Sequence, residues 1–416
     1  MTDAATPKLG AVPAAAPQAA GGVQWLALIL CGMTVFVEGY DAQFMGYVVP
    51  GIASDWGITP PALTPALTMG LLGLMFGAFF IAPLADTYGR RKLVIYSVAA
   101  FGLLTIATAV AETLPVLVGF RFFTGLGLGA AMPNAIALTA EFSPPGKRVT
   151  SVAMMFAAFS IGAAFGGVVT AWLMPSYGWQ SVFIFCGALA LVLLPVLIVA
   201  MPESYTPGGE AKAKIPVGQL FANGRTRITV LIWVVFFTNI MELYFITSWL
   251  PTTLNAQGIS VQAAVIATVL VQVAGAGTAF VVGPLVDRYG PQWILPLVFL
   301  LGAICIGAMG LVGSSVAIAM VTAFGIGIGT VGAQNGNNGV AAKFYPTEIR
   351  ATGVGWALAV GRIGSILGPL IGGVLLATKV DMRTIFLFAA IPPLIAAVAY
   401  LFMGRPPELA GSETES

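Results

Sequence analysis

Residues 82–91, APLADTYGRR, return as GPLVDRYGPQ at residues 283–292, an offset of 201 that keeps the Pro, Leu, Asp, Tyr and Gly. A second pair behaves in the same way, since FSPPGKR at 142–148 returns as FYPTEIR at 344–350, an offset of 202. Both repeated stretches are polar connectors between long apolar runs. The chain therefore contains an internal duplication, and the repeated unit is a set of membrane helices.

The composition supports a membrane protein. Hydrophobic residues make up 58% of the chain and charged residues only 8%, against about 25% charged in soluble domains. A spanning helix needs about 20 apolar residues. We therefore predict an all-α membrane protein with twelve transmembrane helices in two six-helix halves, centred near Val35, Leu74, Leu103, Leu128, Ser160, Leu191, Asn239, Ala274, Ala303, Gly329, Gly364 and Leu394.

Polar stretches set the expected boundaries. Residues 1–22 are rich in Ala, Pro and Gly, without the apolar core of a cleaved signal peptide, and predict a disordered tail. The first bundle is expected at 23–201, a linker at 202–227, the second bundle at 228–404 and a short tail at 405–416. Since each chain would contain both halves of a pathway, we expect a monomer.

Basic residues predict the orientation, because they collect in cytoplasmic loops. With both termini inside, the external loops hold only Lys379 and Arg383. The cytoplasmic segments hold Lys8, Arg90, Arg91, Lys92, Lys147, Arg148, Lys212, Lys214, Arg225, Arg227, Arg288, Lys343, Arg350 and Arg405. Both termini are therefore expected in the cytoplasm.

Several classes of function are disfavoured by what the sequence lacks. The net charge of +2 is too small to indicate nucleic-acid binding. There is no histidine, the three cysteines lie at unrelated spacings in apolar runs, and no Walker A sequence occurs. We therefore expect no cofactor, no metal site and no enzyme activity. A receptor or scaffold is disfavoured because no large soluble domain is present.

Glycines indicate close helix packing. The chain has 51 of them, and Gly364, Gly368 and Gly372 recur every four residues in the eleventh predicted helix. Small residues let helices approach within lipid, where hydrophobicity does not drive association. We expect this face to pack against another helix.

The stretch PLADTYGRRK at 83–92 resembles the signature between the second and third helices of the major facilitator superfamily. This resemblance covers nearly the whole chain and implies a two-half transporter. Asp86, Gly89 and Arg90 stand where the signature requires them, with Asp86 expected near the start of the third helix. The second copy keeps Asp287, Arg288 and Gly290 but lacks the following basic residues, so a weaker latch is expected there. We interpret both copies as gating elements.

Within that superfamily the chain resembles the aromatic acid to proton symporters of bacteria, which implies the inner membrane. The resemblance rests on residues 121–142, residues 345–369 and the short motif EGYD at 38–41. The family usually has an aspartate at the first position of that motif, where this chain has Glu38.

Five charged residues lie within the predicted helices: Glu38, Asp41, Arg121, Glu242 and Arg362. Each costs several kcal/mol in hydrocarbon and must face a cavity or a partner. Asp41 and Arg121 are expected at nearly the same depth. An offset of 201 aligns Asp41 with Glu242, and an offset of 202 aligns Ser160 with Arg362. Each half thus has an acid at one depth, but only the second half has the central arginine.

These charges suggest roles in transport. The resemblance implies that helices 1, 4, 7 and 10 line the central cavity, where Asp41, Arg121 and Glu242 would lie. We hypothesise that Arg362 binds the substrate carboxylate, because a guanidinium can donate two parallel hydrogen bonds to it. Asp41 is the expected proton carrier, with Glu38 assisting and Arg121 controlling its charge, and Glu242 is a second candidate. The alternative is that these charges only form structural ion pairs.

Amides and aromatic rings provide further candidates. Asn335 and Asn338 lie in AQNGNNG at 333–339, and Asn134 lies in the fourth predicted helix. These amides could bind ring hydroxyls or another helix. Tyr40, Tyr244 and Trp249 could stack on an aromatic ring.

The sequence thus predicts a proton-coupled importer of a small aromatic carboxylate that works by alternating access. A carrier of another organic anion, such as a nicotinate-, quinate- or muconate-like acid, is the first alternative. A proton-coupled exporter is disfavoured, because the fifth helix has Gly162, Gly166 and Gly167 without the proline typical of antiporters.

Overall fold

The computed structural model describes residues 21–144, 147–203, 216–346, 349–378 and 380–404. All regular elements in these ranges are helical, in agreement with the predicted class. The predicted tails fall almost entirely outside the described residues, as do positions 204–215 of the predicted linker. The boundaries expected there stay predictions.

The first half begins with α1 (Gly21–Trp56). Its second span consists of η1 (Pro60–Leu63), α2 (Thr64–Phe76), η2 (Gly77–Ile81), η3 (Ala82–Leu84) and α3 (Ala85–Tyr88). The half continues with α4 (Arg90–Thr108), α5 (Leu114–Phe142) and α6 (Arg148–Ala200). α6 contains two spans, because Gly178 interrupts it with φ 76° and ψ 170°, outside the helical range.

The second half follows η4 (Val217–Leu220). It contains α7 (Thr226–Ala256), α8 (Val261–Tyr289), α9 (Pro291–Met309), α10 (Val316–Gly327), η5 (Ile328–Gly332), α11 (Ala333–Phe344), α12 (Arg350–Ala377), α13 (Met382–Ala389) and α14 (Ile391–Met403). Among the described residues, 11 helical runs are long and apolar enough to cross a membrane. The break at Gly178 divides one of them, which gives the predicted twelve.

The duplication is visible in the backbone. Gly89 separates α3 from α4 with φ 91° and ψ 140°, and Gly290 separates α8 from α9 with φ 87° and ψ 150°. Residues with a side chain rarely adopt a positive φ of this size. The repeated sequence therefore encodes a repeated turn.

Helix packing within the two halves is also repeated. Gly162 of α6 lies against the carbonyl group of Phe36 in α1, and Gly364 of α12 lies against the carbonyl group of Phe237 in α7. These two contacts are related by the offsets of 201 and 202. A Cβ atom at either glycine would overlap the backbone of the neighbouring helix. The small-residue face predicted for the eleventh helix is thereby confirmed.

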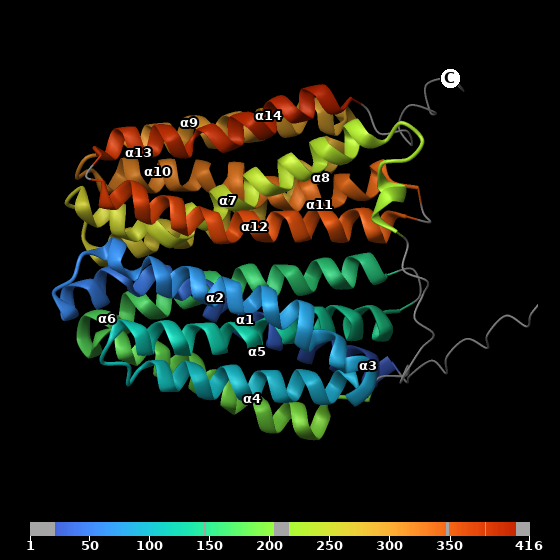
Figure 1. Cartoon of the computed structure of the whole chain (residues 1–416), viewed down its shortest axis with the longest axis horizontal. Helices are drawn as coiled ribbons and strands as arrows, with labels where there is room; N and C mark the ends of the chain where they lie inside the picture. Colours follow the sequence, from blue (N-terminus) through green and yellow to red (C-terminus); the bar gives the residue numbers. More distant parts are fainter. Residues whose placement is uncertain (1–20, 145–146, 204–215, 347–348, 379, 405–416) are drawn as a thin grey trace, which may run out of the picture.

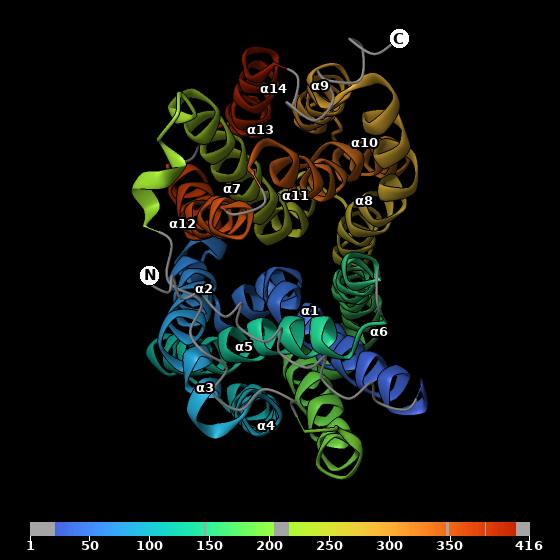
Figure 2. The ribbon, with the colours of Figure 1, turned by 90° about the vertical axis from the view of Figure 1, so that its right-hand side faces the viewer.

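The two halves lie side by side, with both described ends of the chain at one end of the bundle (Figure 1). The end-on view shows α6 beside α8 and α2 beside α12 (Figure 2). Gly46 in the last third of α1 lies against the backbone of Thr247 and Ser248, and Gly373 lies against Thr64 at the start of α2. These contacts join the halves toward the end remote from the termini.

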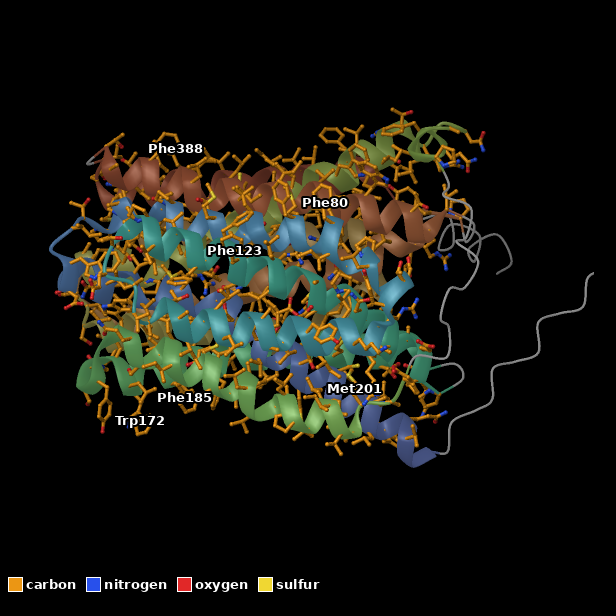
Figure 3. All side chains as sticks on the ribbon, turned by 60° about the horizontal axis from the view of Figure 1, so that its bottom comes forward. Phe80, Phe123, Trp172, Phe185, Met201 and Phe388 are labelled. Atoms are coloured by element: carbon orange, nitrogen blue, oxygen red, sulfur yellow. The ribbon has the colours of Figure 1, made fainter. Side chains whose placement is uncertain are left out.

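The outer surface of the bundle is apolar. Trp172 is 69% exposed and Phe80 is 67% exposed, and both project outward together with Phe123 and Phe388 (Figure 3). A soluble monomer rarely exposes large apolar side chains so extensively. This surface is suited to lipid.

Candidate functional site

Asp41 is the centre of a buried polar cluster in the first half. Its Oδ1 accepts a hydrogen bond of 2.9 Å from Nη1 of Arg121, so the two side chains form an ion pair. Its Oδ2 accepts hydrogen bonds from Thr105 Oγ1 and, at 3.8 Å, from Cys186 Sγ. α1, α4, α5 and α6 each contribute one of these side chains. Such full partnering offsets the cost of burying a carboxylate.

Arg121 connects this cluster to the interface between the halves. Its guanidinium lies 5.6 Å from the centre of the Phe44 ring, a favourable cation–π distance. Its Nε is buried without a hydrogen-bond partner. Arg121 also lines a cavity that is bounded by Gln43 and Gly46 of α1 and by Tyr244 and Ser248 of α7.

The cavity itself lies between the two halves. Its volume of about 20 Å³ leaves room for about one water molecule. The first half supplies its walls from α1, α2 and α5, and the second half from α7. A molecule the size of an aromatic ring does not fit in this volume.

Glu38 and Arg362 lie in opposite halves and are not paired. Glu38 is 1% exposed, and its Oε2 has no hydrogen-bond partner. Arg362 is half-buried in α12, and its Nη2 approaches Sδ of Met132 in α5 at 3.9 Å. No carboxylate among the described residues lies within 4.0 Å of the Arg362 guanidinium. Met132 is one helical turn from Leu128, which lines the cavity.

Glu242, the counterpart of Asp41 in the duplication, has a different environment. It is 1% exposed, and neither carboxylate oxygen has a hydrogen-bond partner in the described structure. Asn239, one turn away on α7, donates a hydrogen bond to the Thr330 carbonyl and accepts one from Asn337. Glu242 therefore adjoins a partnered amide without joining its network.

The amides of the tenth span bind neighbouring groups of the protein. Asn335 donates to the carbonyl oxygen of Gly275 in α8 at 3.4 Å, and Asn338 accepts from Gln334 at 3.2 Å. Asn337 also accepts a hydrogen bond from Tyr400. The residues just before this segment, 328–332, form the π-helical turn η5, so local widening of the helix accompanies these contacts.

The other predicted binding residues are distributed among different environments. Asn134 donates to the carbonyl groups of Ala82 and Ala130. Tyr40 is buried in an aromatic cluster of the first half, with no partner for its hydroxyl. Trp249 is completely buried, and its Nε1 donates to the Pro369 carbonyl. Only Tyr244 among these four lines the cavity between the halves.

The repeated signature turns lie at the end of the bundle that contains the termini. Arg90 forms an ion pair of 3.0 Å with Glu141 of α5, which links the third span to the fourth. Asp86 is exposed in α3, four residues before α4 begins, so it lies near the start of the third span, as predicted. The turn at Gly89 places it at the end of the second span.

In the second copy, the guanidinium of Arg288 lies 5.2 Å from the centre of the Tyr289 ring. The side chain of Asp287 lies outside the described part of the structure. Pro291 and Gln292 occupy the positions that follow the turn, and both are buried. Pro291 and Gln292 correspond to Arg90 and Arg91 of the first copy. They cannot form an ion pair like that of Arg90 with Glu141, and they are instead buried.

Sequence reasoning missed several partners in the site. Thr105 and Cys186 lie in apolar runs, where nothing in the sequence connects them to Asp41. The network of Asn239, Asn337 and Tyr400 was equally unexpected. The duplication contained one signal that could have identified Asn239: an offset of 201 aligns it with Glu38, so this position is polar in both halves.

Comparisons with known proteins agree with this architecture. The family model described as Major Facilitator Superfamily matches residues 25–357 and 232–416. A gallate transporter of Pseudomonas putida is 35% identical, with 92% of each chain covered, and a 4-hydroxybenzoate transporter of Pseudomonas aeruginosa is also 35% identical, with 92% of each covered.

A solved structure supports the same fold. The bacterial homologue of the human lysosomal transporter Spinster, in an inward-facing and occupied conformation, has a TM-score of 0.77 at 17% identity, covering 92% of this chain and 97% of that one. The fold, the paired halves and the sequence relatives lead to one conclusion. The chain belongs to the Major Facilitator Superfamily, and it is a transporter.

Proposed function

We propose that the protein imports a small aromatic carboxylate together with protons across the bacterial inner membrane. The observation that carries this proposal is the buried Asp41–Arg121 pair, which borders the cavity between the halves, while Arg362 lies in the other half without a carboxylate partner. The relatives named for gallate and 4-hydroxybenzoate support the class of substrate. We also propose a monomer with both termini in the cytoplasm.

Asp41 is the proposed proton carrier. Its carboxylate and the Arg121 guanidinium form a buried ion pair, which holds only while Asp41 is ionised. Protonation of Asp41 would break the pair and free Arg121, which already lines the cavity. A change in the protonation of Asp41 would thus alter the position of Arg121 at the surface where the halves meet.

Arg362 is the proposed binding group for the substrate carboxylate. Among the described residues its guanidinium donates one hydrogen bond, to the weakly accepting sulfur of Met132, so its hydrogen-bonding capacity is largely unused. A carboxylate that receives two parallel bonds from the guanidinium would occupy the space between α5 and α12. Tyr244 lines the adjoining cavity and provides an aromatic face.

The test is uptake by purified protein in liposomes, with labelled benzoate, 4-hydroxybenzoate, protocatechuate, gallate and nicotinate. We expect at least one ring acid to accumulate only under an inward proton gradient. Arg362→Ala should abolish binding of that acid, whereas the exposed Glu112→Gln control should leave it unchanged. Accumulation without a gradient, or of non-aromatic anions only, would contradict the proposal.

A further inference from the structure

Two ionisable groups, the Glu38 carboxyl and the Arg362 guanidinium, lie in opposite halves and interact electrostatically, and neither forms an ion pair among the described residues. Glu38 is buried, with its Oε2 unpartnered. Within the described structure, the Arg362 guanidinium donates one hydrogen bond, to the Met132 sulfur. Both residues lie within about one turn of the midpoints of their helices, α1 and α12. An isolated buried charge is costly, so each favours a partner.

Helix geometry places Glu38 beside the central cavity. Glu38, Ala42, Met45 and Gly46 recur at the spacing of one helix face, and the last three line the cavity. Glu38 thus lies one turn from the cavity, on the side of the chain termini. Met132, which contacts Arg362, lies one turn from the cavity wall in the same direction along the bundle.

The charges around Glu38 leave Arg362 as its available counterion. Arg362 and Asp41 are the charged groups that act on Glu38 electrostatically. Arg121 of α5 is already paired with Asp41, and Cys186 of α6 donates to the same carboxylate. α7 contributes Glu242, which is acidic, and Tyr244, which lines the cavity, and neither side chain is a cation that could serve as a counterion.

We propose that Glu38 is a release residue, which competes with the substrate carboxylate for Arg362. This inference rests on the proposed function. When Glu38 is protonated, Arg362 is free to bind the substrate. When Glu38 loses its proton, the carboxylate pairs with the guanidinium and displaces the substrate. Proton loss and substrate release would then occur at one pair of side chains, whereas Asp41 responds to the gradient through Arg121.

The experiment is equilibrium binding of 4-hydroxybenzoate to purified protein at about pH 5.5 and about pH 8, where the carboxylate of the probe stays ionised. Wild type should bind more weakly at the higher pH, where ionised Glu38 competes. Glu38→Gln should bind about tenfold more tightly than wild type at about pH 8, the effect of one close charge pair. At about pH 5.5 the two proteins should differ less than about twofold.

Three further variants separate this role from the alternatives. Glu38→Asp should restore the pH dependence, and Asp41→Asn should retain it while losing gradient-driven uptake. Glu112→Gln is the matched surface control. The inference is overturned if Glu38→Gln keeps the wild-type pH dependence, or if Asp41→Asn removes it. Wild-type protein that binds and moves no aromatic acid would instead refute the proposed function.

Discussion

α1 and α7 each carry a pair of buried polar side chains at equivalent positions, but the member of the pair that has hydrogen-bond partners differs between the two helices. In α1, Asp41 has an arginine and two hydrogen-bond donors, whereas Glu38, one turn away, has an unpartnered oxygen. In α7 the positions are reversed, because Asn239 is fully engaged and Glu242 has no partner. Both halves have the helix and its two polar positions. The first half partners the residue at the second position, Asp41, whereas the second half partners the residue at the first position, Asn239.

The physical reason lies in the neighbouring helices. Offsets of 200 to 202 align Arg121 with Val321, Thr322 and Ala323, none of which is charged. At an offset of 201, Thr105 corresponds to Ile306. The second half thus has an acid in α7 but lacks a cation and a hydroxyl at the positions that correspond to Arg121 and Thr105. Two equivalent positions can therefore have different functions.

The largest expected effect is that of Asp41→Asn on transport. Because asparagine cannot carry the proton or form an ion pair with Arg121, gradient-driven uptake should fall by about a hundredfold or more, the size of effect expected when a proton-transferring group is removed. Glu242→Gln should keep uptake within a few-fold of wild type. Initial uptake rates in liposomes would compare the two variants, and the reverse order would make Glu242 the carrier.

The next effect concerns stability. Arg121→Leu leaves Asp41 buried without a counterion, so the free energy of unfolding should fall by about 3–5 kcal/mol. Thermal unfolding of the purified protein would measure this loss. Adding Asp41→Asn to the same chain should recover most of it, because the uncompensated charge is then removed. Failure of the double variant to recover would show that Arg121 stabilises the bundle by packing alone.

The equivalent glycine contacts should respond alike in the two halves. Gly162→Val and Gly364→Val each place side-chain atoms against the backbone of the neighbouring helix. We expect each to lower the stability by about 1–3 kcal/mol, the usual cost of overpacking. The half-buried Gly119, mutated to Val, would serve as a control, since no atom lies within 4 Å of a Cβ there. If the two variants lost very different amounts of stability, the two glycine contacts would not be equivalent.

Removal of the Glu242 carboxylate should have little effect on stability. Glu242→Leu deletes two buried oxygens that make no hydrogen bond, so the protein should be unchanged or stabilised by up to about 1–3 kcal/mol. The same unfolding assay would detect this change. A marked destabilisation would mean that Glu242 has a partner in another state of the transport cycle.

The smallest effect is expected at the turn before α13, which lies outside the spans. Hydrogen bonds from Thr384 lower the pKa of Asp381 below its ordinary value of 3.8. Because the folded pKa is lowered, this contribution to stability is present above the ordinary value and is lost as the pH falls through the lowered one. Asp381→Ala should therefore reduce stability slightly at neutral pH and less at strongly acidic pH. The corresponding turn of the first half has Gly178, which has no ionisable side chain, so a substitution there should not change how stability depends on pH.

Much of the fold could be predicted from the sequence by itself. Hydropathy fixed the number of spans, because the length of an apolar run is a local property set by the thickness of the bilayer. The repeated motif predicted two matched halves, and the structure repeats the turn at Gly89 and Gly290. The glycine spacing in the eleventh span predicted its packing face, since a face follows from helical periodicity.

The partners of the buried charges were decided only by the tertiary structure. The similar depths of Asp41 and Arg121 could be predicted from the sequence, and the structure brings the two side chains together. Nothing local, however, distinguishes the paired Asp41 from the unpaired Glu242. That difference depends on which side chains α4, α5 and α6 present at the same level. Trp249 shows the same limit, because its ring suggested a binding role and the structure packs it between α7 and α12. A helix face is encoded in neighbouring residues, whereas the partner of a buried charge is set by residues far away in the chain.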